Sequence, residues 1–189
     1  MYKNKTMNKF SVFILLATVL FSGCVSEEEN TQIIFERDLK NIELYLSENA
    51  ISSVKEIKDP ASGLVLLWQE VSASGKLPVV GDTLKVDYVG KLSNNKVFDT
   101  SLESVAKDND LFNANRVYAP LELLFGYGQV IPGFEYALSK MEMGDKATVI
   151  IPSVYGYGSQ QVSTIPKNSI LIFEIDLVEV NGVQIPDDL

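Results

Sequence analysis

Hydrophobic residues recur at two different spacings along the chain, and each spacing predicts a different element. Over residues 31–48 they return at every third or fourth position, between a polar start and Asn49, which predicts one amphipathic helix. Its apolar stripe must cover either the domain that follows or the same stripe on a second copy, so packing on its own domain and homodimerisation are both open alternatives. The stripe consists of Phe35, Leu39, Ile42, Tyr45 and Leu46.

The rest of the chain has the pattern of strands around one short helix. Residues 84–88 alternate apolar with charged side chains, which is typical of a strand with one buried face. Asn94-Asn95 supplies a turn to the next strand, and Pro132 begins a short helix. Antiparallel strands packed on one helix make an α+β domain. The other predicted strands are 64–71, 96–99, 121–123, 146–152 and 169–180, with the helix at 132–141 and an irregular polar stretch at 102–117.

The first residues resemble an export signal. Three lysines precede the uncharged run 10–21, which is long enough for a signal-peptide core and too short to span a bilayer as a helix. Shortly after this run comes Cys24, the only cysteine, in an arrangement that resembles a bacterial lipobox. We therefore expect residues 1–23 to be removed and Cys24 to be lipidated, which would anchor the protein to a membrane. The alternative is an ordinary secretory signal with a buried thiol.

An acidic segment begins at the cysteine. Residues 24–30 include three consecutive glutamates and cannot bury themselves, so we expect a solvated tether. The same composition also resembles the surface-export signal of some lipoproteins. The expected location is therefore the cell envelope, on the periplasmic face or the cell surface. The expected organisation is a signal peptide (1–23), the tether (24–30), an N-terminal helical extension (31–60) and one folded domain (61–182).

Charge and composition exclude several classes of function. The chain carries 16 basic and 25 acidic residues, and without the three lysines of the signal its net charge falls from −9 to −12. This excess of negative charge excludes nucleic acid as a partner. With no histidine and one cysteine, the usual zinc site or histidine-based triad cannot be built. Asp108 and Asp110 lack the spacing of a calcium loop, so no metal or other cofactor is expected.

Six segments between residues 81 and 180 form an ordered series of motifs. In order they are GDTLKVDYVGKL (81–92), VFDTS (97–101), FGYGQVIPGFEYAL (125–138), MEMGDKATVIIP (141–152), YGYG (155–158) and IPKNSILIFEIDLVEV (165–180). Their order and approximate spacing closely resemble the FKBP-type peptidyl-prolyl cis-trans isomerases. The resemblance implies a strongly twisted antiparallel sheet of five or six strands, curved over one short helix, with the active pocket between the sheet and the helix.

The resemblance also implies which residues form the pocket. Asp99, Tyr157 and Ile131 would act on the imide bond of a bound proline, Ile131 through its backbone N–H. Taken alone, Asp99 is equally the turn former expected after a strand, and Phe173 alternates along its strand as a core residue would. The positions that would hold the substrate are Tyr88, Phe98, Leu121, Gln129, Val130, Phe134, Ile165 and Phe173.

Two positions and one insertion distinguish this chain from the family pattern. Phe134 stands where most members carry a tryptophan, and Leu121 stands where a phenylalanine is common, so a slightly roomier and less aromatic site is expected. The chain between Phe98 and Leu121 is longer than in minimal members. Within this insertion, Arg116 is the expected ion partner of Asp99.

The sequence supports one main hypothesis and two alternatives. The first is a peptidyl-prolyl isomerase that assists the folding of exported proteins, by twisting and desolvating the imide bond in an aromatic pocket. Its partners would be proline-containing unfolded polypeptides and, as ligands, rapamycin-like macrolides. The second is a weakly active or inactive peptide-binding module or chaperone that keeps the fold. The third is a purely structural lipoprotein, which would have neither activity nor affinity for macrolides.

Overall fold

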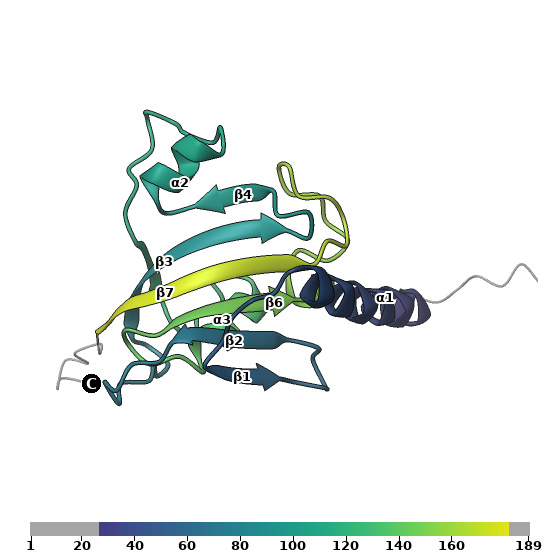
Figure 1. Cartoon of the computed structure of the whole chain (residues 1–189), viewed down its shortest axis with the longest axis horizontal. Helices are drawn as coiled ribbons and strands as arrows, with labels where there is room; N and C mark the ends of the chain where they lie inside the picture. Colours follow the sequence, from purple (N-terminus) through teal and green to yellow (C-terminus); the bar gives the residue numbers. More distant parts are fainter. Residues whose placement is uncertain (1–26, 182–189) are drawn as a thin grey trace, which may run out of the picture.

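The computed structural model describes residues 27–181, which are built around one antiparallel sheet (Figure 1). Within these residues the sheet has seven strands, in the order β1-β2-β6-β7-β3-β4, with β5 also paired to β3. The predicted α+β class is confirmed, and the sheet has more strands than the five or six that were expected. The strands are β1 (Lys55–Lys58), β2 (Val65–Glu70), β3 (Thr83–Leu92), β4 (Val97–Thr100), β5 (Leu121–Leu124), β6 (Lys146–Ile151) and β7 (Leu171–Asn181).

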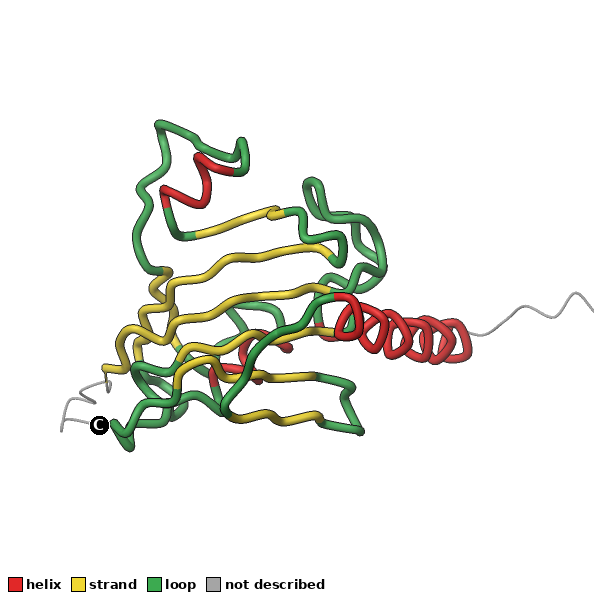
Figure 2. The backbone as a smooth tube through the Cα atoms, in the orientation of Figure 1, coloured by secondary structure: helices red, strands yellow, loops and turns green. Residues whose placement is uncertain are grey.

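Three α-helices and one 3-10 turn accompany the sheet in the described part of the chain. They are α1 (Glu27–Glu48), α2 (Glu103–Asp108), α3 (Pro132–Leu138) and the turn η1 (Ser153–Tyr155). In Figure 2, α1 projects from one end of the sheet, while α3 lies behind the strands. Between residues 27 and 181, no helix combines the length and the apolar character needed to cross a bilayer.

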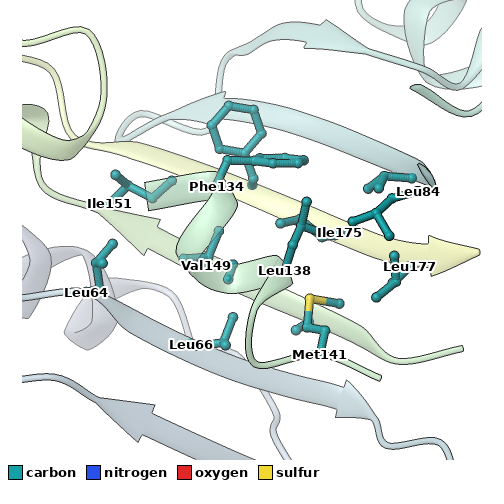
Figure 3. Close-up of a cluster of buried hydrophobic side chains, with 14 of the residues drawn as sticks. Leu64, Leu66, Leu84, Phe134, Leu138, Met141, Val149, Ile151, Ile175 and Leu177 are labelled. Atoms are coloured by element: carbon teal, nitrogen blue, oxygen red, sulfur yellow. The ribbon is translucent and has the colours of Figure 1, made fainter. Parts of the chain in front are cut away.

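The face of the sheet that α3 covers carries the main hydrophobic core. Side chains from α3, β2, β3, β6 and β7 meet there, as Figure 3 shows. The helix packs closely because Gly133 has no side chain, and a Cβ there would lie 2.4 Å from Cγ2 of Ile151. The central residues are Leu64, Leu66, Leu84, Phe134, Leu138, Met141, Val149, Ile151, Ile175 and Leu177.

The opposite face of the sheet carries a smaller core under α1. Alternation along β2 sends Leu66 and Trp68 to the main core but Val65 and Leu67 to this second one. Ile42 and Tyr45 of α1, 3% and 5% exposed, pack on it, with Ile150, Ile170 and Ile172 from the sheet side. The C-terminal half of the predicted stripe therefore packs on the chain's own domain. A homodimer through residues 31–48 stays a prediction.

Several predicted boundaries need correction. Helix α1 begins at Glu27, so residues 27–30 of the predicted tether are helical. Strand β1 lies inside the predicted helical extension 31–60 and pairs with β2, so the boundary after residue 60 divides a hairpin. Helix α2 lies in the stretch predicted to be irregular, where Ala106 is its buried residue. Helix α3 ends at Leu138, three residues before the predicted end at 141.

Candidate functional site

An aromatic pocket lies between the sheet and helix α3. Its volume is about 400 Å³. Strands β3, β4, β5 and β7, helix α3 and two loops contribute to its wall. The lining residues are Tyr88, Phe98, Asp99, Leu121, Gly128, Gln129, Val130, Ile131, Phe134, Tyr157 and Phe173.

Four of the five aromatic side chains in this lining contact one another, with Phe173 at their centre. The ring of Phe173 lies 5.1 Å from that of Phe134 and 5.6 Å from that of Phe98, and both pairs are edge to face. The ring of Tyr88 lies 6.2 Å from both Phe134 and Phe173. Edge-to-face contacts place the positive edge of one ring against the negative face of another. The rings therefore brace one another and leave a concave apolar surface.

Gly90 makes room for two of these rings and was not predicted as a site residue. A Cβ at Gly90 would lie 2.7 Å from two ring atoms of Phe98 and 2.9 Å from Cε1 of Phe173. The pairing of β3 with β4 also shifts register between Gly90 and Lys91. A glycine inside an alternating strand often marks a bulge or a close approach, so this signal was present in the sequence.

Several polar groups surround Asp99 at the rim of the pocket. The hydroxyl of Tyr88 donates to Oδ2 of Asp99 at 2.6 Å, and the guanidinium of Arg116 donates to Oδ1 at 2.5 Å. The backbone N–H of Thr100 also donates to Oδ1, at 2.9 Å. The expected ion pair between Arg116 and Asp99 is confirmed. The carboxylate is thus held in one orientation by three donors.

Burial and the carboxylate together raise the pKa values of the nearby phenols. Burial, followed by the hydrogen bond to Asp99 and its negative charge, raises the pKa of Tyr88 to about 12. Burial, and then the charge of Asp99, raises the pKa of Tyr157. The hydrogen bond to Asp99 is the main cause that raises the pKa of Arg116. Phenols are already protonated at neutral pH, so these shifts extend the range in which both can donate a hydrogen bond further into alkaline pH.

The loop before α3 contributes Ile131, with its backbone N–H, to the wall of the pocket. Gly126 and Gly128 have φ values of +86° and +64°, a region that favours glycine. The side chain of Gln129 accepts from the backbone N–H of Leu124 at 2.8 Å, so this predicted substrate-binding side chain secures the loop. The carbonyl of Ile131 accepts from the first turn of α3, while its N–H donates to no acceptor within residues 27–181.

The structure brings the predicted site residues together, with one exception. Ile165 does not line the pocket: it is 4% exposed and lies in the main core, which it shares with Phe134 and Phe173. Gly128 lines the pocket and was not predicted. The predicted lipidation residue Cys24 lies outside the described residues. Within residues 27–181, no three acidic, thiol or imidazole side chains gather as a metal site would require.

Fold and pocket define a class of α+β domain in which a curved antiparallel sheet and a short helix enclose an aromatic, acid-rimmed pocket. Residues 75–178 match the family model described as FKBP-type peptidyl-prolyl cis-trans isomerase, and the chain belongs to this family.

Two curated relatives and one solved structure illustrate the similarity. The short-type peptidyl-prolyl cis-trans isomerase of Methanocaldococcus jannaschii is 43% identical over 90 residues, covering 46% of this chain and 57% of that protein. FK506-binding protein 1 of Eremothecium gossypii is 35% identical over 105 residues, covering 55% and 81%. The crystal structure of FkpA from Escherichia coli aligns with a TM-score of 0.59 at 26% identity. That alignment covers 82% of this chain and 64% of the FkpA chain, so this chain spans less than two thirds of FkpA and of the archaeal relative.

Proposed function

We propose that this protein is a peptidyl-prolyl cis-trans isomerase that acts on unfolded, proline-containing polypeptides. The observation that carries the proposal is the cluster of rings around Phe173, with the Asp99 carboxylate fixed at its rim. Such a pocket offers apolar surface to a proline ring and a polar edge to the adjoining amide. The named relatives are isomerases and FK506-binding proteins, so macrolides of that kind are proposed ligands.

The reaction needs rotation about one bond and no bond cleavage. Resonance gives the imide C–N bond partial double-bond character, with a barrier of about 18–20 kcal/mol. The twisted amide has less charge separation than the planar one, so a site that excludes water favours the twisted form. The rings of Phe134 and Phe173 are 3% and 6% exposed and would provide this apolar environment. A thousandfold acceleration requires a stabilisation of only about 4 kcal/mol.

The polar groups would control the twist. The N–H of Ile131 and the hydroxyl of Tyr157 would donate to the carbonyls that flank the proline, which fixes both sides of the rotating bond. Asp99 would act through its charge on the rotating carbonyl, in the orientation that Tyr88 and Arg116 impose. Interactions of this kind accelerate the reaction only where they are stronger in the twisted state than in the planar state.

A binding module that isomerises slowly is the second candidate. Exposed apolar side chains adjoin the site in sequence, since Val117 is 87% exposed next to Arg116 and Tyr127 is 62% exposed next to Gly128. Surface of this kind suits an unfolded chain. Exchange at an Xaa-Pro bond separates the two candidates. A binding module would prevent the aggregation of an unfolded client without accelerating this exchange.

The decisive experiment measures isomerisation of a Leu-Pro peptide by exchange spectroscopy. Asp99→Leu and Tyr157→Phe should each lower the rate about tenfold, the change expected when one hydrogen bond or charge interaction of the twisted state is lost. Tyr155→Phe is the matched control, since Tyr155 packs on the main core and does not line the pocket. Unchanged rates in both variants would refute the assigned roles, and an inactive wild-type chain would favour the binding module.

We also propose that the protein works in the cell envelope, anchored through Cys24. The support is the lipobox-like sequence around Cys24 after an uncharged run. Its clients there would be exported chains that fold outside the cytoplasm. Cys24→Ala should move the protein from the membrane fraction to the soluble fraction, and an unchanged distribution would contradict the anchor. Labelling of intact cells with an impermeant reagent separates the cell surface from the periplasmic face.

A further inference from the structure

Helix α1 is hydrogen-bonded to the start of the loop that carries Tyr157. We define the Tyr157 loop as residues 153–168. Asp38 of α1 is completely buried, and its Oδ2 accepts from the backbone N–H of Ser153 at 2.8 Å and from the Ser153 hydroxyl. A buried carboxylate is unfavourable unless it is well paired. The first residue of the loop is therefore attached to the helix through two donors.

The neighbouring residue of α1 contacts the other end of the same loop. The guanidinium of Arg37 donates to the carbonyl of Asn168 at 2.8 Å and to Oδ1 of Asp38 at 2.7 Å. The Arg37 side chain is 47% exposed. Two adjacent helix residues thus hold both ends of the Tyr157 loop and are paired with each other.

Backbone hydrogen bonds connect the two ends of the loop through Gly158. The N–H of Gly158 donates to the carbonyl of Ser153 at 2.8 Å, and the N–H of Asn168 donates to the carbonyl of Gly158 at 2.7 Å. A continuous series of hydrogen bonds therefore connects Asp38 with Arg37, through Ser153, Gly158 and Asn168. Gly158 directly follows Tyr157, so the backbone beside the phenol is tied to α1.

The helix also packs closely at this point. Gly63 has a φ of +69°, and a Cβ there would lie 2.3 Å from Leu39 of α1, 3.3 Å from Pro152 and 3.4 Å from Phe35. Pro152 directly precedes the Tyr157 loop. Figure 1 shows α1 and the connection between β6 and β7 at the same end of the sheet.

We propose that Arg37 and Asp38 are positioning residues for the isomerase reaction, which hold the Tyr157 loop so that its phenol faces the pocket. The inference rests on the proposed function. Apolar contacts of Ile42 and Tyr45 already attach α1 to the sheet. Hydrogen bonds are directional, so the buried polar group fixes the geometry of the loop where apolar contacts alone would not.

The test compares three variants of the whole protein. Asp38→Ala removes the acceptor for Ser153, and Arg37→Gln removes the donor to Asn168. Tyr45→Phe is the control, because it removes a hydrogen bond of 3.0 Å from α1 to Asn95, away from the loop. For each variant, kcat and KM for a Leu-Pro peptide, amide exchange at Gly158 and Asn168, and the urea midpoint are measured.

We expect Asp38→Ala to lower kcat about tenfold with a smaller change in KM, as for the loss of one positioning interaction. Amide exchange at Gly158 and Asn168 should accelerate, and Arg37→Gln should show the same pattern more weakly. Tyr45→Phe should leave kcat and both exchange rates unchanged. Should Asp38→Ala fail to fold, Arg37→Gln decides, because its side chain is half exposed.

Two other outcomes would refute the positioning role, and a third would refute the proposed function. Wild-type kcat in both Arg37→Gln and Asp38→Ala would refute the positioning role while leaving the proposed function intact. An equal fall of kcat in Tyr45→Phe would also refute it, because attachment of α1 in general would then be the cause. A wild-type protein that does not isomerise the peptide would overturn the proposed function, and the inference with it.

Discussion

On β7, Phe173 and Ile172 are neighbours in the chain but lie on opposite faces of the sheet. Phe173 joins the rings of the pocket under α3, whereas Ile172 packs in the smaller core under α1. Beyond α1, the second face carries ion pairs such as Lys91 with Glu174. One strand therefore contributes to two environments, one shaped by ring geometry and one formed by aliphatic packing and surface charge. The comparison indicates that the pocket face can lose function through small displacements, while the other face mainly contributes stability.

The largest effects are expected from alanine substitutions at Phe173 and Ile172, which test the two faces of the sheet separately. Phe173→Ala should lower the free energy of unfolding by about 3–5 kcal/mol, because it leaves a cavity among three rings, and Ile172→Ala by about 2–5 kcal/mol. Phe173→Ala should also abolish isomerisation and macrolide binding. Folded Ile172→Ala should keep the wild-type kcat/KM. Urea unfolding and the peptide assay measure both, and a similar loss of activity in Ile172→Ala would contradict the separation of the faces.

A smaller change tests the ring geometry itself. Gly90→Ala places a Cβ within 3 Å of the rings of Phe98 and Phe173, which must then shift. Overpacking of this kind costs about 1–3 kcal/mol, and we expect a clear fall in kcat/KM. Gly75→Ala is the control for a loss of stability without displaced rings: its φ of +65° disfavours alanine, but a Cβ there meets no atom within 4 Å and Gly75 does not line the pocket, so kcat/KM should stay unchanged. Equal activity of Gly90→Ala and wild type would show that the pocket tolerates displaced rings.

Alkaline pH should affect both faces through buried phenols. The pKa of Tyr88 is raised to about 12 from an ordinary 10.0, and burial followed by the charge of Glu174 raises the pKa of Tyr45 on the other face. The unfolded chain then releases these protons first, so the free energy of unfolding should be unaffected by them below pH 10 and fall as pH rises toward 12. Tyr88→Phe should reduce this fall in urea unfolding curves. A curve parallel to wild type would contradict the raised pKa of Tyr88.

The smallest effect is expected at the surface of the second face. Lys91 pairs with Glu174, and the two side chains are 23% and 50% exposed. Exposed pairs contribute little, so Lys91→Met should change the free energy of unfolding by less than about 1 kcal/mol and leave isomerisation unchanged. A loss of several kcal/mol, measured by urea unfolding at low salt, would show that this pair belongs to the buried structure.

Elements with a strong local pattern were predicted well. The alternation at residues 84–88 lies in β3, and most of the predicted strand 169–180 lies in β7, which pairs with β3. Pro132 marks the first residue of α3. Most of the pocket was located through the family motifs, and the pairing of Arg116 with Asp99 followed from the same reasoning. These features are encoded in short segments, so they can be recognised without the fold.

Features that depend on distant contacts were missed. Strand β1 has only Ile57 as an apolar residue, because an edge strand exposes most of its side chains, so no alternation was visible. The role of Gly90 depends on rings from two other strands. Asp38 carries no signal in the sequence, since its partner Ser153 lies 115 positions further along the chain.

If Cys24 is lipidated as proposed, the length of α1 limits which parts of a polypeptide can reach the pocket. Its 22 residues correspond to a rod about 33 Å long at 1.5 Å per residue. Since α1 packs on the sheet through Ile42 and Tyr45, and Cys24 comes just before it in the sequence, a lipid at Cys24 would keep the pocket away from the bilayer surface. A newly translocated polypeptide would then have to emerge by a comparable span before its prolines could be reached.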